Sequence, residues 1–424
     1  MIAENISRPA SLIVFSDDWG RHPSSCQHLI KQLLPDYNVL WVNTIGTRAP
    51  RFDLATIKRV TEKLKQWTQK KQESTEEGDS TANHANLTVV NPRMWPWFSR
   101  SHDRQLNSWL LSRQLAPMIN NLPQPVTAIT TLPITADLVG LLPVDQWIYY
   151  CVDDFGEWPG LDGNTLREMD VRMIQKADRI VAVSEHLQSM IRSCGRSSTL
   201  LTHGVDLNCW QQSSKTLSVS DILPADATGP LAVFWGVVDR RLNSEMIISL
   251  SEQMKDGHIL LVGPQQDPDE RILNLHNVHT PGPLPFSSLP ALAKTADVLI
   301  MPYADLPVTR AMQPLKMKEY MATGRPVVVS NLPAVAEWSD CLDVVSSPKD
   351  FAEIVIQRVT SGIPDVQLDA RTRLRGESWA SKARQLERSI SLQQMQMPQD
   401  SAGEVNTTKT KLLQETFEGT SSAN

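Results

Sequence analysis

Short apolar runs alternate with helix-like segments almost from end to end of this 424-residue chain. Several runs are continuous and rich in β-branched residues, which is expected of strands buried on both faces of a parallel sheet. Strands that alternate with helices form βαβ units, and these build doubly wound α/β sheets. The predicted strands are Leu12–Ser16, Tyr37–Asn43, Leu87–Pro92, Val126–Leu132, Trp147–Val152, Arg179–Ser184 and Thr199–Thr202 in the first half, and Leu231–Trp235, His258–Gly263, Asn277–Thr280, Asp297–Pro302, Val327–Ser330 and Asp343–Ser346 in the second.

The length of the chain predicts two domains, because a single hydrophobic core rarely grows this large. Gln211–Pro230 is polar, contains two prolines and is typical of a linker. We therefore expect an N-terminal Rossmann-like domain over residues 1–210 and a C-terminal one over residues 231–365. Ligands of such sheets bind beyond the carboxyl ends of the strands, so the two domains should face each other across a cleft.

The composition argues against several classes of protein. A net charge of -6 does not suit a nucleic-acid binder, which would carry a basic excess. The five cysteines are scattered without paired spacing, as expected of reduced thiols in a cytoplasmic protein without a zinc site. The N-terminus has no basic region before an apolar one, and no apolar run approaches the ~20 residues that cross a bilayer. We expect a cytoplasmic protein.

Two segments stand apart from this pattern. Arg51–Glu77 begins as a basic amphipathic helix and ends as an acidic, Ser- and Thr-rich loop. The helix is either a solvated helix packed on its domain or a surface for an anionic partner. That partner would be an anionic acceptor or, through residues 51–71, anionic lipid at the inner membrane face. Residues 393–424 are polar, nearly lack aromatic residues and show no sustained period, which predicts a disordered tail.

The most informative stretch is AMQPLKMKEYMATGRPVVVS, from Ala311 to Ser330. Pro314 suits the first turn of a helix, and Gly324 with Pro326 ends it. The amino end of this helix, at Pro314 and Leu315, predicts a phosphate-binding site. Lys316 and Glu319 then share one helix face, where a carboxylate could accept hydrogen bonds from the hydroxyls of a ribose. The alternative is a surface ion pair between the two side chains.

The same stretch resembles the donor-binding segment of GT-B glycosyltransferases of family four, the group 1 glycosyl transferases. Glu319 corresponds to the second of two glutamates in that family's motif, and ATGRPVV to the run that follows it. Four more stretches are similar to the family in the same order: LTHGVD at Leu201–Asp206, VFWGVVDRRLN at Val233–Asn243, ADVLIMPY at Ala296–Tyr303 and ESWASKARQLERSI at Glu377–Ile390. The resemblance covers roughly residues 10–390.

The resemblance implies a GT-B fold with an acceptor-side N-terminal domain and a nucleotide-sugar-binding C-terminal domain. It also implies that residues 366–392 form a closing helix that crosses back to the N-terminal domain. Two departures from the family pattern matter. Ala311 stands where the first glutamate is usual, and Val237 where an arginine usually follows Gly236. We infer that Arg241 and Lys316 neutralise the donor diphosphate, with Arg240 in reserve.

Two polar corners complete the predicted site. The loop after the first strand resembles a corner of a subset of these transferases, and its Arg21 and His22 could contact the diphosphate or the acceptor. The alternative is an elaborate helix cap, in which Ser24 or Ser25 caps the next helix. After the fifth strand, Asp153 or Asp154 could hold an acceptor hydroxyl or act as a base, or cap a turn.

The predicted function is transfer of a sugar from a nucleotide-diphosphate sugar to a hydroxyl of a glycan or lipid-linked acceptor. The resemblance implies retention of configuration, no bound metal and no cofactor beyond the nucleotide sugar itself. Two alternatives remain open. One is a nucleotide-sugar epimerase of the same fold, and the other is a scaffold protein that binds a sugar nucleotide without turnover. Ala311 is the feature that supports the scaffold.

Overall fold

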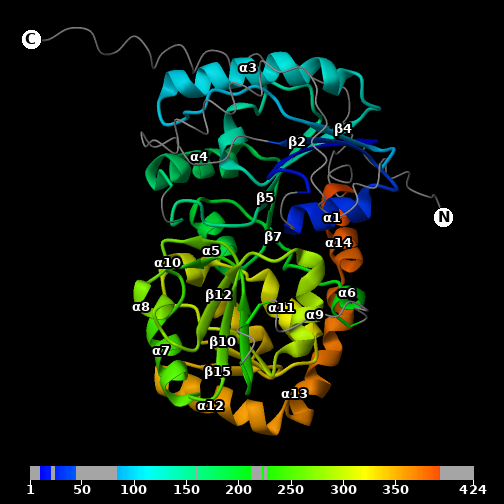
Figure 1. Ribbon diagram of the computed structural model, residues 1–424. Coiled ribbons are helices and arrows are strands. Elements are labelled where there is room, and N and C mark those ends of the chain that lie inside the picture. Colours follow the sequence, from blue (N-terminus) through cyan, green and yellow to red (C-terminus); the bar gives the residue numbers. More distant parts are fainter. Residues whose placement is uncertain are drawn as a thin grey trace, which may run out of the picture.

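A computed structural model describes residues 10–20, 24–43, 84–158, 161–211, 222–223 and 227–391. Figure 1 shows two stacked lobes, the N-terminal one coloured blue to green and the C-terminal one green to orange. The predictions for Arg21, His22, the basic segment Arg51–Glu77, most of the linker and the tail 393–424 lie outside the described residues. None of the described helices is long and apolar enough to span a membrane.

The N-terminal domain is built on a seven-stranded parallel sheet in the order β3-β2-β1-β4-β5-β6-β7. Its strands are β1 (Ser11–Ser16), β2 (Asn38–Asn43), β3 (Leu87–Val90), β4 (Val126–Thr130), β5 (Gln146–Cys151), β6 (Arg179–Ala182) and β7 (Thr199–Leu200). Its helices are α1 (Ser25–Leu33), α3 (Ser101–Asn120), α4 (Gly163–Lys176), α5 (Glu185–Ser193), α6 (Leu207–Gln211) and the 3-10 turn η1 (Pro133–Asp137). The central strands β1, β4 and β5 are buried along their whole length, as predicted for a sheet covered on both faces.

The C-terminal domain repeats this plan with a six-stranded parallel sheet in the order β12-β10-β8-β13-β14-β15. Its strands are β8 (Leu231–Trp235), β10 (His258–Val262), β12 (Val278–Gly282), β13 (Val298–Met301), β14 (Val327–Ser330) and β15 (Asp343–Val345), with a separate small pair β9 (Val238–Asp239) and β11 (Gln265–Gln266). Its helices are α7 (Ser244–Gln253), α8 (Glu270–Leu273), α9 (Leu289–Thr295), α10 (Pro307–Ala311), α11 (Leu315–Ala322), α12 (Pro348–Ser361) and α13 (Asp365–Ala370), with 3-10 turns η3 (Phe286–Ser288), η4 (Pro333–Trp338) and η5 (Arg371–Glu377).

The prediction of two Rossmann-like α/β domains is therefore confirmed, and every predicted strand overlaps a strand of the structure. Several predicted strands are too long at their carboxyl ends. The run Val126–Leu132, for example, leaves the sheet after Thr130, because Pro133 opens the turn η1. The small pair β9 and β11 was not predicted, since each strand has two residues and carries no alternating pattern.

The last helix, α14 (Trp379–Ser391), belongs by its packing to the N-terminal domain although it follows the C-terminal one in sequence. Figure 1 shows it in orange-red beside α1. Its buried residues Trp379, Ala383, Leu386 and Ile390 join the hydrophobic core of the N-terminal sheet. Trp379 also stacks on His28 of α1 with ring centroids 4.6 Å apart.

A buried ionic cluster joins the two domains where α14 begins. Lys318 of α11 forms an ion pair with Glu377 and donates to the carbonyl of His203 at 2.7 Å. Lys382 of α14 contacts the same Glu377 carboxylate at 2.7 Å and donates to Thr202 at 2.9 Å. The side chains of Lys318 and Lys382 are 2% and 6% exposed. One carboxylate thus compensates two buried ammonium groups at the crossover between the domains.

Candidate active site between the two domains

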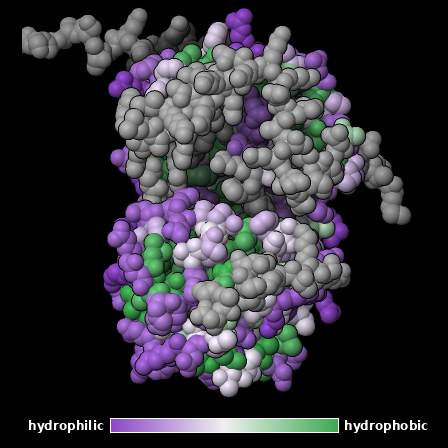
Figure 2. All heavy atoms as spheres, viewed as in Figure 1, coloured by the Kyte–Doolittle hydropathy of each residue, from purple (hydrophilic) through white to green (hydrophobic). Residues whose placement is uncertain are grey.

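The candidate site lies where the strand order of each sheet reverses. In the C-terminal sheet this point is between β8 and β13, and in the N-terminal sheet it is between β1 and β4. Parallel α/β sheets bind ligands in the crevice outside these carboxyl ends. Figure 2 shows the molecule narrowing between its two lobes on one face, with hydrophilic residues on much of the lower lobe. The side chains predicted from sequence converge on this region to different extents.

Gly236 and Lys316 lie together at the carboxyl end of β8. Gly236 has φ +145, and a Cβ there would lie 2.0 Å from the Lys316 ammonium nitrogen. Lys316 donates to the Tyr303 hydroxyl at 2.7 Å and lies over the Phe234 ring, 4.5 Å from its centroid. Among the described residues it has no ion-pair partner, since both of these contacts are neutral. The cation is therefore held in place with its charge uncompensated by a carboxylate in direct contact.

The two neighbouring arginines have opposite surroundings. Arg241 is 6% exposed, and its Nε lies 2.9 and 3.0 Å from the two carboxylate oxygens of Asp239. Its guanidinium lies 4.9 Å from the centre of the Trp158 ring, which belongs to the N-terminal domain. Arg240 instead points to the surface, where it pairs with the exposed Asp267 at 2.8 Å. Arg241 is thus directed toward the N-terminal domain, and Arg240 lies on the surface of the C-terminal one.

The two acids after β5 differ in the same way. Asp153 accepts a hydrogen bond from the Trp158 indole and lies within the electrostatic reach of Arg241 across the cleft. Burial raises the pKa of the Asp153 carboxyl to about 7, and the Asp154 charge adds to this rise while Arg241 opposes it. Asp154 accepts from the N–H of Gly156 at 3.1 Å, the bond of a turn. Asp153 is thus the acid with the properties of a proton-transfer group.

Glu319 lies one turn into α11, on the inner side of the helix. It is partly buried and accepts a hydrogen bond from the Trp235 indole at 3.4 Å. Burial raises the pKa of the Glu319 carboxyl to about 7, against the effects of that hydrogen bond and of the Lys316 charge. Pro314 is the residue that caps α11, one position before the first turn in which the sequence predicted it. Leu315, the first residue of the helix, packs against the core of the N-terminal domain.

The burial of Glu319 gives a prediction that separates ligand binding from stability. Glu319→Gln should weaken nucleoside-diphosphate binding at least about tenfold, because charged hydrogen bonds contribute about 1.5–3 kcal/mol each. The substitution should also remove a pH dependence of the free energy of unfolding. The folded state holds the proton of Glu319 up to about pH 7 whereas the unfolded chain releases it near pH 4.5, so the parent loses stability between these values.

Calorimetric titration and urea unfolding at pH 5 and pH 8 check both parts. The variant should be more stable than the parent at pH 8 and close to it at pH 5. A surface ion pair with Lys316 would give the reverse pattern, with unchanged nucleotide affinity and a small loss of stability at pH 8. That pattern would remove Glu319 from the donor site.

Many polar groups in the corner after β1 form hydrogen bonds with one another. The Asp17 carboxylate accepts from Ser24 at 2.9 Å and from the Gln27 amide at 2.7 Å. Ser24 is the cap of α1, and its hydroxyl accepts from the N–H of Gln27 at 3.3 Å. The N–H of Gly20 is held by the Gln27 side chain at 3.0 Å. The cap alternative therefore accounts for this part of the corner, and Arg21 and His22 keep the role of site candidates.

Sequence reasoning missed three side chains of the cleft and one cluster. Trp158 follows the predicted acids Asp153 and Asp154 closely in sequence, yet an isolated tryptophan carries no spacing signal. Asp239 precedes Arg241 by two residues, and nothing in the sequence indicates which of the two arginines it pairs with. Tyr303 directly follows the predicted strand Asp297–Pro302, and a single tyrosine at the end of a strand carries no signal of its own. The ionic cluster around Lys318 joins segments far apart in the chain, so no local pattern indicates it.

Comparison with known proteins bears on this arrangement. Residues 232–361 match the family model described as Glycosyl transferases group 1. Over 223 residues the chain is 29% identical to TuaH of Bacillus subtilis (strain 168), whose name assigns it a glycosyltransferase role in teichuronic acid biosynthesis. The match covers 49% of this chain and 56% of TuaH. The resemblance to the group 1 glycosyl transferases is confirmed.

Solved structures share the two-domain fold of this chain. The structure of HepE from Anabaena in complex with UDP-glucose matches 90% of this chain and 99% of its own, with a TM-score of 0.61 and 14% identity. Sucrose-phosphate synthase from Thermosynechococcus elongatus matches 89% of this chain and 97% of its own, with a TM-score of 0.62 and 17% identity. The fold is GT-B. Among the described residues, no three His, Cys, Asp or Glu side chains gather as metal ligands would, and independence from metal stays a prediction.

Proposed function

We propose that this protein is a glycosyltransferase that moves a sugar from a nucleotide-diphosphate sugar to a hydroxyl of a glycan or lipid-linked acceptor, with retention of configuration. The observation that carries the proposal is the pair of cations at the carboxyl end of β8. Lys316 has neutral contacts beside Gly236, and Arg241 lies between Asp239 and Trp158. Cations fixed before the reaction stabilise the charge that grows on a leaving nucleoside diphosphate without further reorganisation.

The two cations would divide this work. Asp239 compensates the charge of Arg241 and fixes its direction, so Arg241 orients the diphosphate through its remaining N–H groups. Lys316 brings the net positive charge. Gly236 supports both roles, because a glycine lets the backbone and the diphosphate approach each other closely. Glu319 would hold the ribose, one helical turn from Lys316.

Asp153 would serve the acceptor. With a pKa of about 7 it exchanges protons readily at neutral pH, and it lies opposite Arg241 on the other side of the cleft. In this proposal it holds the acceptor hydroxyl and receives its proton as the new glycosidic bond forms. A retaining reaction does not require Asp153 to attack the sugar, because the leaving phosphate can take part on the same face. Asp154 would hold the loop in shape through its turn.

The similar proteins support a proposal for the donor and the product. HepE was solved with UDP, with UDP and glucose, and with UDP-glucose, and this supports a UDP-linked hexose as the donor. The name of TuaH supports polysaccharide or glycoconjugate biosynthesis as the setting. A cytoplasmic location, with a peripheral membrane contact through residues 51–71, is part of the proposal.

Product analysis with a panel of sugar nucleotides tests the proposal. Release of the nucleoside diphosphate that depends on an added acceptor supports the transferase. An isomerised donor without acceptor would assign the epimerase instead. Donor binding without any turnover would favour the scaffold, for which the buried Ala311 in place of a glutamate is the supporting feature.

A further inference from the structure

A second hollow lies on the N-terminal domain, away from the cleft. It is an open groove of about 800 Å³ between α3, the end of η1 and α4. Figure 1 shows α3 at the end of the N-terminal lobe opposite the C-terminal domain. The side chains that matter for its chemistry are Arg104, Trp109, Arg113, Asp137, Leu141 and Arg172. Nothing in the proposed transfer reaction uses them.

The groove contains an exposed aromatic surface. Trp109 is 56% exposed and Leu141 is 55% exposed, and both line the same hollow. Single exposed apolar residues are ordinary, but neighbouring ones in a concave surface indicate a binding site. The Arg113 guanidinium lies 5.4 Å from the centre of the Trp109 ring. This contact orients the indole beside a cation. A flat indole offers a platform for the apolar face of a pyranose ring.

The groove also carries an excess of positive charge. Arg104, Arg113 and Arg172 line it, and Asp137 is the acid among its lining residues. Asp137 lies 3.5 Å from Arg104 and 3.9 Å from Arg172, which is beyond good hydrogen-bonding distance. Its Oδ2 is buried without a hydrogen-bond partner. The guanidinium groups of Arg113 and Arg172 thus keep N–H donors for an anionic ligand.

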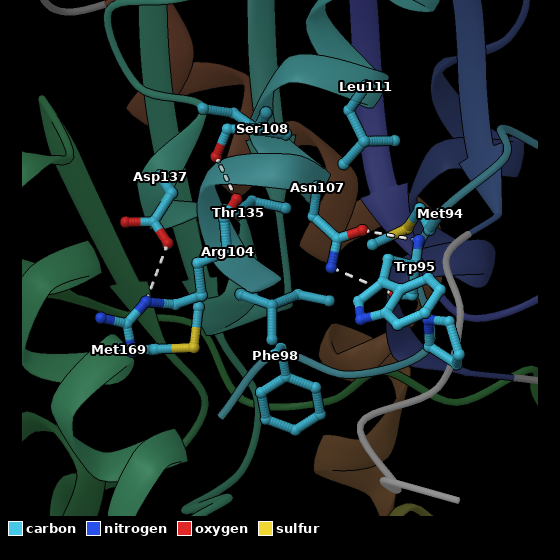
Figure 3. A pocket seen from close by; sticks show the side chains of 13 residues that line it. Met94, Trp95, Phe98, Arg104, Asn107, Ser108, Leu111, Thr135, Asp137 and Met169 are labelled. Atoms are coloured by element: carbon cyan, nitrogen blue, oxygen red, sulfur yellow. Dashed lines mark hydrogen bonds and ion pairs between the residues drawn. The ribbon is translucent and has the colours of Figure 1, made fainter. Parts of the chain in front are cut away.

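The floor of the groove is ordered by its neighbours. Figure 3 shows Arg104 and Asp137 from the side of a small adjoining cavity of about 30 Å³, with Phe98 and Met169 nearby. The Arg104 side chain is 13% exposed and that of Asp137 is 21% exposed, so both are largely fixed by packing. Arg172 is 46% exposed and lies at the rim. A fixed floor and an open, basic rim suit a chain-like ligand that lies along the surface.

We propose that this groove binds an acidic glycan, a chain of pyranose sugars that carry carboxylate groups. Trp109 stacks on a sugar ring, and Arg113 and Arg172 pair with carboxylates on either side of it. A lipid surface fits less well, because Trp109 lines the groove together with three arginines and the acid Asp137 and not among apolar side chains alone. The proposal concerns a site separate from the transfer cleft and does not depend on the reaction there.

Calorimetric titration of the full chain with hexagalacturonate, an oligosaccharide with six carboxylates, tests the proposal. We expect binding that weakens with added salt, as charge pairing requires. Neutral maltohexaose should bind at least about tenfold more weakly. Trp109→Ala and the double variant Arg113→Gln/Arg172→Gln should each lower the affinity at least about tenfold, which is one decade in Kd. Thermal unfolding of each variant confirms that it is folded.

Matched controls lie on the C-terminal domain. Val366→Ala removes an apolar side chain that is 75% exposed, and Arg375→Gln removes an exposed cation. Both should bind hexagalacturonate as the parent does, and so should the cleft variant Lys316→Gln. Equal affinities in all variants, no binding by the parent, or a preference for phosphatidylglycerol vesicles that depends on Trp109 would each overturn the proposal. A loss of glycan binding in Lys316→Gln would show that the glycan occupies the transfer cleft instead.

Discussion

Lys316→Gln should lower the rate of sugar transfer by about 10²- to 10³-fold, the usual loss when one fixed electrostatic contact to a transition state is removed. The ammonium group has a neutral hydroxyl and two aromatic rings as its contacts, so its charge is available to a ligand. Glutamine keeps the polarity and nearly the length of the side chain but cannot supply the charge. Steady-state kinetics with a UDP-sugar panel and calorimetric titration of UDP provide the measurement.

The control for this variant is Lys349→Gln in α12. Lys349 is 79% exposed and pairs with Glu353 at 3.6 Å on the surface, so its loss should leave transfer unchanged. If Lys316 serves packing rather than catalysis, Lys316→Gln should lose thermal stability and retain its activity per folded molecule. That outcome would contradict the assignment of the diphosphate site.

The fold was predictable because its signal is local and repeated. A strand such as β8 or β14 is a continuous apolar run, and a parallel sheet buries such runs on both faces whatever their distant partners are. The reversal of strand order then follows from the doubly wound plan. The carboxyl ends of β1 and β8 lie at the two points where strand order reverses, and for this reason the sequence placed candidate residues at Gly236 and in the corner after β1; Lys316 was predicted from its place on a helix.

The details of the site depend on contacts that no local pattern encodes. Arg240 and Arg241 are neighbours with the same chemistry, yet one pairs with Asp267 on the surface and the other is buried against Asp239. Both lie in the turn after β9, where the Asp239 carboxylate accepts from the backbone N–H and the guanidinium of Arg241, while Arg240 pairs with the exposed Asp267. Asp153 and Asp154 also differ in their contacts. Asp153 accepts a hydrogen bond from Trp158, whereas Asp154 accepts one from the N–H of Gly156 in a turn.

The buried ionic cluster around Glu377 helps to hold α14 against the N-terminal domain. Two ammonium groups that are almost fully buried require a nearby carboxylate, and Glu377 supplies it for both. Burial alone would raise the pKa of Glu377, but the charges of Lys318 and Lys382 hold it below its ordinary value. Burial also lowers the pKa of Lys318, against the charge of Glu377. The cluster therefore links α11 of one domain to α14 of the other.

Glu377→Gln should lower the free energy of unfolding by about 3 kcal/mol at pH 7, because it leaves two buried cations without a counter-ion. Raising the pH should then restore part of the loss, because burial lowers the pKa of Lys318, so the folded variant releases that proton more readily than the unfolded chain does. Urea unfolding at pH 7 and pH 10 measures both effects.

Glu353→Gln, which breaks the exposed pair with Lys349, is the matched control and should cost less than about 1 kcal/mol at either pH. A destabilisation of Glu377→Gln as small as that of the control would mean that water compensates the two lysines. The crossover of α14 would then be held by the packing of Trp379, Ala383 and Leu386 rather than by charge.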